Sequence, residues 1–166
     1  ESETRELTEL VNELVELATD RRDTEAPASV SLAEVAERVA ERFRRRSGRA
    51  ITVHADQSTV LARPQQLERA VSNLVENAVK FTGDGVEVGI AAGVVAVSDR
   101  GPGLGDADAT KIFDRFYRSD SARALPGSGL GLSIVRDMAE THGGTVFARN
   151  REGGGATIGF QLPVSG

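Results

Sequence analysis

A polar stripe runs along one side of the helix that is predicted over residues 64 to about 80. A helix advances about 100° per residue, so these side chains share one side and apolar side chains share the other. The stripe contains Gln66, Arg69, Asn73, Glu76, Asn77 and Lys80. Amide and carboxylate oxygens are ligands that Mg²⁺ prefers, and a nearby ammonium suits phosphate. The ridge therefore suits a Mg²⁺ and phosphate site, although a solvated helix face explains the pattern equally well.

A second candidate is an aspartate at the end of an apolar strand. Residues 94 to 98 are predicted to form that strand, and Asp99 follows it, with Gly101, Gly103 and Gly105 at alternating positions. A partly buried carboxylate needs hydrogen-bond donors, and the amino edge of adenine supplies one. The glycines let the backbone come close to a planar ligand. Taken alone, the motif is more often an ordinary strand-ending turn.

A second glycine cluster opens the last predicted helix, over residues 129 to 141. Free N–H groups at a helix start can hold phosphate oxygens, so we expect the cluster to face phosphate. Its members are Gly127, Ser128, Gly129, Leu130, Gly131 and Leu132. No Gly-Lys-Ser/Thr follows, so this is not a Walker loop. Residues 119–126 are polar without periodicity, which indicates a lid, and Arg118 at its root could stabilise transferred charge.

The elements that must position these residues predict an α+β two-layer sandwich, with about three helices on one face of a mixed sheet. Ser31 and Glu34 form a capping-box pattern that opens a helix, and residues 86–97 read as a hairpin. Shorter strands are predicted at 51–53, 60–61, 145–149 and 156–162. The side chains of Phe113 and Phe116 are expected to fill space in the hydrophobic core.

The beginning of the chain has a different pattern. Leu7, Leu10, Leu14 and Leu17 form a stripe at helical spacing, which fits a helix hairpin or a dimeric bundle, with packing on its own domain as the alternative. We therefore divide the chain into a leading helix at 1–21, a linker at 22–29 and a globular domain at 30–166. The chain begins at Glu1 without Met, and we expect further sequence upstream.

Composition narrows the choice of function. The 166 residues include no cysteine, which excludes disulfides and thiolate metal sites. The net charge of −5 argues against broad nucleic-acid binding. No stretch is apolar for long enough to span a bilayer, so any membrane attachment is expected through upstream segments.

The order and spacing of these motifs resemble the ATP-binding catalytic domain of sensor histidine kinases, of the GHKL (Bergerat) superfamily. Residues 73–81 resemble the N box, 99–105 the G1 box, 113–118 the F box and 127–132 the G2 box. Residues 141–144 match the usual helix end, and the likeness covers about residues 28–163. Residues 1–20 resemble the end of the dimerisation and phosphotransfer helix. The details are most similar to actinobacterial members.

The resemblance implies roles for the matched residues. Asp99 would accept the adenine amino group, and Gly101, Gly103 and Gly105 would shape that pocket. Asn73 and Asn77 would bind Mg²⁺ and face the phosphates of ATP. The catalytic set would be Asn73, Glu76, Lys80 and Arg118. The remaining nucleotide contacts would come from Phe81, where a Tyr is common, from Tyr117 and from residues 127–132.

The same resemblance implies partners. The γ-phosphoryl would pass to a His on the protein's own dimerisation and phosphotransfer domain, and then to an Asp of a response-regulator receiver domain. The full-length protein would be a homodimer, with this domain in the cytoplasm below a membrane anchor. Neither His54 nor His142 lies in an acceptor context. Two alternatives stay open: an ATPase or serine kinase of the anti-sigma type, and a nucleotide-sensing module without phosphotransfer.

Overall fold

The central feature of the fold is a five-stranded mixed sheet. The computed structural model describes residues 7–8, 10–12, 14–15, 25–83, 85–105, 108–115, 117 and 131–165. The strands lie in the order β2 (Ile51–Ala55), β4 (Val86–Ala91), β5 (Val94–Ser98), β7 (Ala156–Gln161) and β6 (Thr145–Asn150). β2 runs parallel to β4, and every other pairing is antiparallel. The predicted mixed sheet is confirmed.

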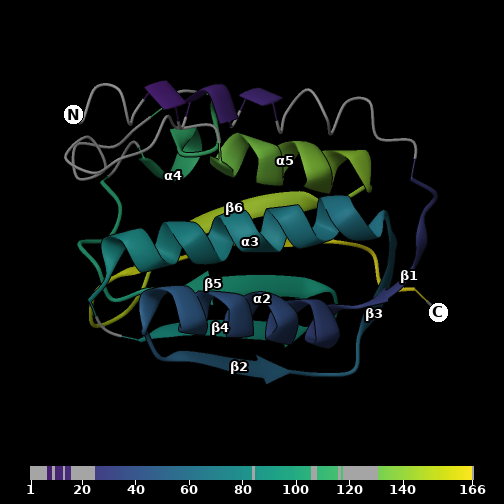
Figure 1. The fold of residues 1–166 in the computed structure, drawn as a ribbon, viewed down its shortest axis with the longest axis horizontal. Coiled ribbons are helices and arrows are strands. Elements are labelled where there is room, and N and C mark those ends of the chain that lie inside the picture. The colour runs from purple at the N-terminus through teal and green to yellow at the C-terminus, as the bar shows by residue number, and fades with distance from the viewer. Residues whose placement is uncertain are drawn as a thin grey trace.

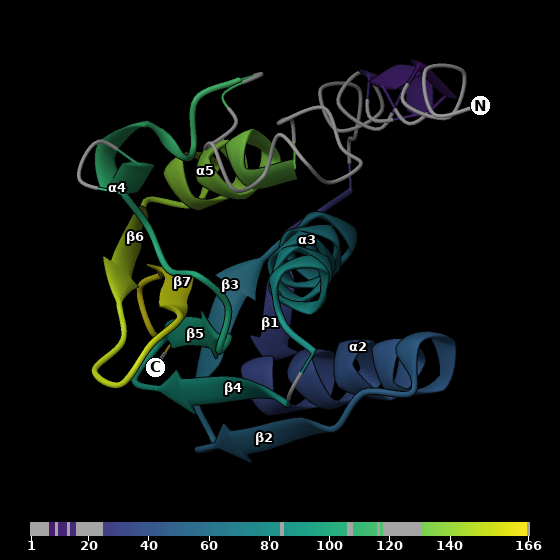
Figure 2. The same cartoon turned by 90° about the vertical axis from the view of Figure 1, so that its left-hand side faces the viewer.

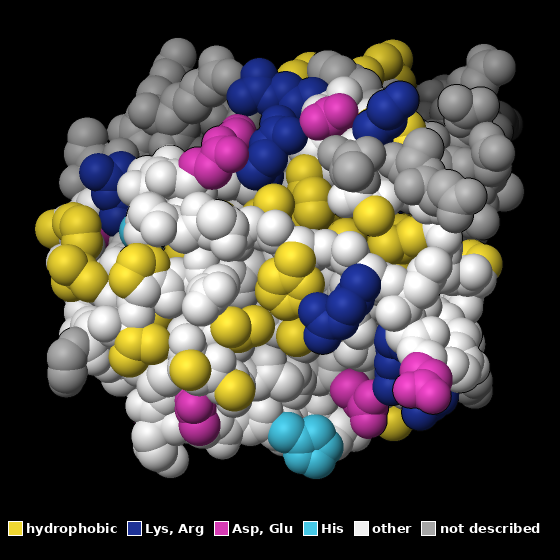
Figure 3. Space-filling view, turned by 180° about the vertical axis from the view of Figure 1, so that it is seen from behind, with side chains coloured by type: hydrophobic (Ala, Val, Ile, Leu, Met, Phe, Trp, Pro, Cys, Tyr) yellow, Lys and Arg dark blue, Asp and Glu magenta, His cyan; other side chains and the backbone are white. Residues whose placement is uncertain are grey.

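Three helices cover one face of this sheet. They are α2 (Leu32–Ser47), α3 (Pro64–Phe81) and α5 (Gly131–Thr141), and Figures 1 and 2 show them side by side in one layer. A short helix, α4 (Asp108–Lys111), precedes α5. In the described part of the chain no helix covers the opposite face, where scattered hydrophobic side chains reach the surface between polar ones (Figure 3). The predicted two-layer α+β sandwich is therefore confirmed.

The hydrophobic core lies between the two layers. Alternate residues of β4 are buried, because successive strand residues point to opposite faces of a sheet. They meet the apolar stripe of α3, including Leu67 and Leu74, and Phe160 of β7, all almost fully buried. Phe113 is buried in the same core, as predicted. Packing of α3 on both the sheet and its neighbouring helices holds its polar stripe in place.

Local sequence explains where the helices begin and end. The Ser31 hydroxyl oxygen accepts a hydrogen bond from the Glu34 N–H at 3.3 Å, which confirms the predicted cap of α2. Gly48, at φ 69°, ends that helix in the left-handed conformation. Pro64 is the first residue of α3, as expected from its fixed φ and missing N–H.

The strand β1, the short helix α4 and one buried side chain differ from the sequence predictions. Residues 28–29, placed in the linker, belong to β1 (Ala28–Ser31), which pairs antiparallel with β3 (Thr59–Ala62). The strand is only four residues long, Ala-Ser-Val-Ser, and so short an alternation does not distinguish a strand from a loop. Gln66, placed on the polar stripe, is only 8% exposed, since α3 packs against other elements on more than one side.

The predicted leading helix falls mainly outside the described residues. Those described within it, at 7–8, 10–12 and 14–15, are helical. Members of its apolar stripe are open to solvent, with Leu7 61% and Leu14 44% exposed.

His142 ties the end of α5 to the start of α3. Its Nε2 accepts a hydrogen bond from the Arg63 N–H at 3.1 Å, and its Nδ1 lies 2.7 Å from the Met138 carbonyl oxygen. One neutral tautomer, with the proton on Nδ1, satisfies both contacts. Arg63 is the N-cap of α3 and makes no side-chain capping bond, so the imidazole supplies an acceptor at this helix start.

We expect His142→Ala to lower the free energy of unfolding by about 1–2 kcal/mol, because it leaves the Arg63 N–H without its acceptor. His54 provides the control, since it is an exposed residue of β2. His54→Ala should change stability by less than about 0.5 kcal/mol. Urea unfolding followed by circular dichroism measures both variants, and equal losses would contradict this role.

Candidate functional site

Asp99 sits at the end of β5 in a frame of backbone hydrogen bonds. The side chain is 3% exposed, and its Oδ1 accepts from the Gly101 N–H at 2.9 Å and from the Ala156 N–H at 3.2 Å. The Asp99 N–H donates to the Ala156 carbonyl at 2.9 Å, which continues the β5–β7 ladder. Both donors use the same oxygen, so among the described residues Oδ2 stays available to a ligand.

A narrow cleft opens beside this carboxylate. Its wall is formed by the end of α3, the loop after β5, the turn after α4, and β7. The lining residues are Asn77, Phe81, Asp99, Pro102, Gly103, Leu104, Ile112, Ala156 and Ile158. The lining is mostly apolar with one carboxylate and one amide, which is the chemistry that a flat heteroaromatic ring with an amino group requires. The cleft encloses about 20 Å³, so lining side chains must turn aside to admit a purine.

At two glycines of the loop after β5, neighbouring protein atoms leave no room for a side chain. A Cβ on Gly101 would lie 2.3 Å from the Phe81 carbonyl oxygen, so this glycine lets the loop pack on the end of α3. Gly103 has φ +81°, and a Cβ there would lie 2.8 Å from Oδ1 of Asn150. The sequence suggested close approach to a ligand, and the structure adds close approach to the protein itself. Gly105 is exposed farther along the same loop.

The polar stripe of α3 divides between two places. Asn77 lines the cleft beside Asp99. Asn73, one turn earlier, is half-buried, and its Cγ lies 3.9 Å from where a Cβ of Gly131 would be, at the start of α5. Within the described part of the chain, the amide nitrogen of Asn73 is buried without a hydrogen-bond partner. Such a group is costly to bury unless a ligand or solvent satisfies it.

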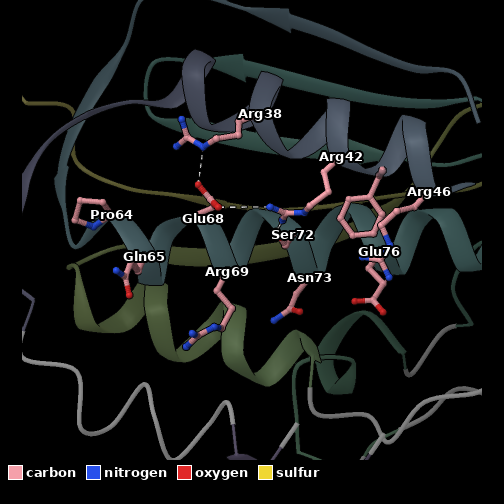
Figure 4. A pocket seen from close by; sticks show the side chains of 11 residues that line it. Arg38, Arg42, Arg46, Pro64, Gln65, Glu68, Arg69, Ser72, Asn73 and Glu76 are labelled. Carbon is pink, nitrogen blue, oxygen red and sulfur yellow. Dashed lines mark hydrogen bonds and ion pairs between the residues drawn. The ribbon is translucent and has the colours of Figure 1, made fainter. Parts of the chain in front are cut away.

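A larger groove of about 450 Å³ lies between α2 and α3, and Asn73 and Glu76 line it. Figure 4 shows Arg38 and Arg42 of α2 facing Glu68 of α3, with N–O distances of 2.7 and 3.5 Å. Arg42 also bonds the Ser72 hydroxyl. The groove is therefore crossed by ion pairs and hydrogen bonds between two helices, whereas the cleft beside Asp99 is mostly apolar.

The other predicted site residues lie in varied surroundings. Lys80 is exposed at the end of α3, and Tyr117 is half-buried with its N–H donating to the Asp114 carbonyl at 3.2 Å. Gly131 begins α5, and Leu132 is 8% exposed within the hydrophobic core. The rest fall outside the described residues: Phe116, Arg118, Gly127, Ser128, Gly129 and Leu130.

The turn between β6 and β7 contributes contacts that were not anticipated. Arg151 donates to the Asp99 carbonyl at 3.0 Å and forms an ion pair with Glu87 at 2.8 Å. Gly155, at φ +91°, lies so close that a Cβ would be 2.0 Å from the Asp99 carbonyl oxygen. The only sequence feature here was a glycine-rich turn, which revealed nothing about what lies against it.

Comparison with known proteins agrees with this arrangement. Residues 62–166 match the family described as histidine kinase-, DNA gyrase B- and HSP90-like ATPases. The chain belongs to this family. A kinase/phosphatase named MprB from Mycobacterium sp. (strain KMS) is 38% identical over 167 residues, covering 96% of this chain and 32% of that protein.

Solved structures of sensor kinases share the fold. A mycobacterial sensor histidine kinase MprB aligns with TM-score 0.73 and 32% identity, over 84% of this chain and 98% of that one. Full-length ShkA in complex with AMPPNP aligns with TM-score 0.79 and 30% identity, over 97% of this chain and 36% of that one. The family member described here is thus the ATP-binding catalytic domain of a two-component sensor histidine kinase.

The chain spans about a third of the length of the curated relatives it matches. In the described part of this sensor kinase domain, we find no helix whose length and apolarity suit a membrane crossing.

Proposed function

We propose that this domain transfers the γ-phosphoryl group of ATP to a histidine on a dimerisation helix of the same protein, and that the phosphoryl then passes to an aspartate of a response-regulator receiver domain. The observation that carries the proposal is the shared cleft of Asp99 and Asn77, where an adenine acceptor meets the asparagine ridge. The kinase names of the relatives support the same reaction.

The reaction needs little covalent chemistry from this domain. A neutral imidazole nitrogen attacks the γ-phosphorus, an N–P bond forms, and the P–O bond to the departing ADP breaks. The remaining imidazole N–H can then release its proton. Catalysis is therefore mainly positioning and charge stabilisation. Asp99 fixes the adenine end, and the exposed Glu76 and Lys80 stand where an incoming helix can reach them.

Mg²⁺ fits the residues that surround the phosphate side of this site. Among the described residues the buried amide nitrogen of Asn73 has no partner, which leaves a donor for a phosphate oxygen, and Asn77 lies one helical turn farther along the same ridge. Amide oxygens suit Mg²⁺, which keeps several waters and takes few protein ligands. We propose Asn77 and Asn73 as its protein ligands, with Arg118 and residues 127–132 on the triphosphate. When bound, the ion neutralises charge on the phosphates.

The proposal extends to assembly and placement. The exposed apolar stripe of the leading helix, including Leu7 and Leu14, supports a homodimer through a longer dimerisation domain. One short helix alone is expected to dimerise weakly or not at all. Because ATP is available in the cytoplasm, we propose that this domain lies there, below a membrane anchor elsewhere in the full-length protein. Cell fractionation with an antibody to this domain tests that placement.

Phosphotransfer in trans tests the proposed reaction. We expect the purified chain, mixed with radiolabelled ATP, Mg²⁺ and an acceptor fragment carrying the dimerisation histidine, to label that fragment with acid-labile, base-stable phosphate. Acid-stable phosphate would indicate a serine kinase of the anti-sigma type. ATP binding without any transfer would favour a nucleotide-sensing module, and either result would overturn the histidine kinase proposal.

A further inference from the structure

The side chain of Asn150 closes two hydrogen bonds onto the backbone of Leu104. Its Oδ1 accepts from the Leu104 N–H at 2.6 Å, and its Nδ2 donates to the Leu104 carbonyl at 3.1 Å. A carboxamide has one acceptor and two donors, so it can imitate the pairing edge of a neighbouring strand. The last residue of β6 thereby holds a loop that no strand pairs at this point.

Gly103 leaves space for the Asn150 carboxamide beside the loop. Oδ1 of Asn150 lies 2.8 Å from where a Cβ of Gly103 would be, and Gly103 has φ +81°. A side chain at position 103 would push the carboxamide away from Leu104. The glycine immediately before Leu104 therefore leaves room for the two-bond contact.

Leu104 and Gly103 belong to the wall of the cleft beside Asp99, whereas Asn150 does not line that cleft. Asn150 itself is exposed at the end of β6. Any influence on a ligand must therefore pass through the backbone of Leu104. The neighbouring Arg151 holds the Asp99 carbonyl at 3.0 Å, so two adjacent residues each hold the backbone of a residue that lines this cleft.

We propose that Asn150 is a positioning residue for the purine, which fixes the Gly103–Leu104 wall relative to Asp99 before ATP binds. This inference rests on the proposed nucleotide site. A wall that is already ordered spares the ligand the conformational entropy of ordering it, and so raises affinity. The effect should reach every ligand that carries the adenine base, whatever its number of phosphates.

Calorimetric titration with ADP and with ATP tests this role. We expect Asn150→Ala to raise the Kd of both nucleotides about tenfold, with the ratio of the two Kd values unchanged. Asn150→Asp keeps the size of the side chain but cannot donate to the Leu104 carbonyl, so it should also weaken both nucleotides at least about threefold. Glu152→Ala, an exposed residue of the same turn, is the matched control and should bind as the unaltered chain does.

Hydrogen exchange of the Leu104 amide gives a readout without nucleotide. Exchange should be at least about tenfold faster in Asn150→Ala than in Glu152→Ala, at a temperature where both are folded. Affinities of Asn150→Ala within twofold of the control, tighter binding, or a changed ADP-to-ATP ratio would each overturn the inference. Failure of the unaltered chain to bind either nucleotide would instead overturn the nucleotide site itself.

Discussion

Asp99→Asn should weaken ATP binding at least about a hundredfold while leaving the fold intact. The asparagine can keep its oxygen on the Gly101 and Ala156 N–H groups, which hold Oδ1 at 2.9 and 3.2 Å. Its amide nitrogen then replaces Oδ2 and presents a donor to the donor amino group of adenine. A lost charge-assisted bond with a mismatched donor costs about 3 kcal/mol, and about 1.4 kcal/mol corresponds to tenfold.

Isothermal titration calorimetry with Mg²⁺ and a non-hydrolysable ATP analogue measures this loss. Ser98→Ala is the control, because Ser98 precedes Asp99 and its hydroxyl bonds the Thr157 hydroxyl at 2.8 Å. The control should retain affinity, and urea unfolding should show both variants folded. Asp99→Ala, which removes the carboxylate altogether, is expected to abolish ATP binding. Undiminished binding by Asp99→Asn would contradict the adenine assignment.

The parts of the site that the sequence predicts are those determined by short-range patterns. Alternating valines in β4 and an apolar run in β5 indicate a hairpin, so the position of Asp99 at a strand end follows directly. Helical periodicity places Asn73 and Asn77 on one ridge of α3. A single packing step, α3 laid against the sheet, then brings the Asn77 end of that ridge beside Asp99.

The parts that it does not predict depend on contacts between distant positions. Asn150 and Arg151 reach the loop after β5 across 46 and 52 positions of sequence. In the sequence, an asparagine or arginine at the end of a strand carries no mark of such a partner. Gln66 shows the same limit, since the helical wheel cannot tell which side of α3 another helix will cover.

Gly155→Ala should both destabilise the fold and weaken nucleotide binding, because a methyl group there has no space. Its Cβ would lie 2.0 Å from the Asp99 carbonyl oxygen and 2.7 Å from the Asp99 carbonyl carbon, at a residue with φ +91°. Overpacking against backbone and left-handed strain together should cost about 3 kcal/mol or more. Relief requires Asp99 to move, which displaces its carboxylate from the cleft.

Gly153→Ala separates the cost of left-handed backbone strain from the cost of a steric clash with Asp99. Gly153 lies in the same turn at φ +88°, with nothing within 4 Å of a Cβ. It should therefore cost only the left-handed strain, about 1–2 kcal/mol, and leave affinity unchanged. Urea unfolding and ATP titration of the two variants measure the difference. Equal losses of stability and affinity would mean that the turn matters only for its own conformation, whereas a loss of affinity confined to Gly155→Ala would show that β7 holds Asp99 in place for adenine.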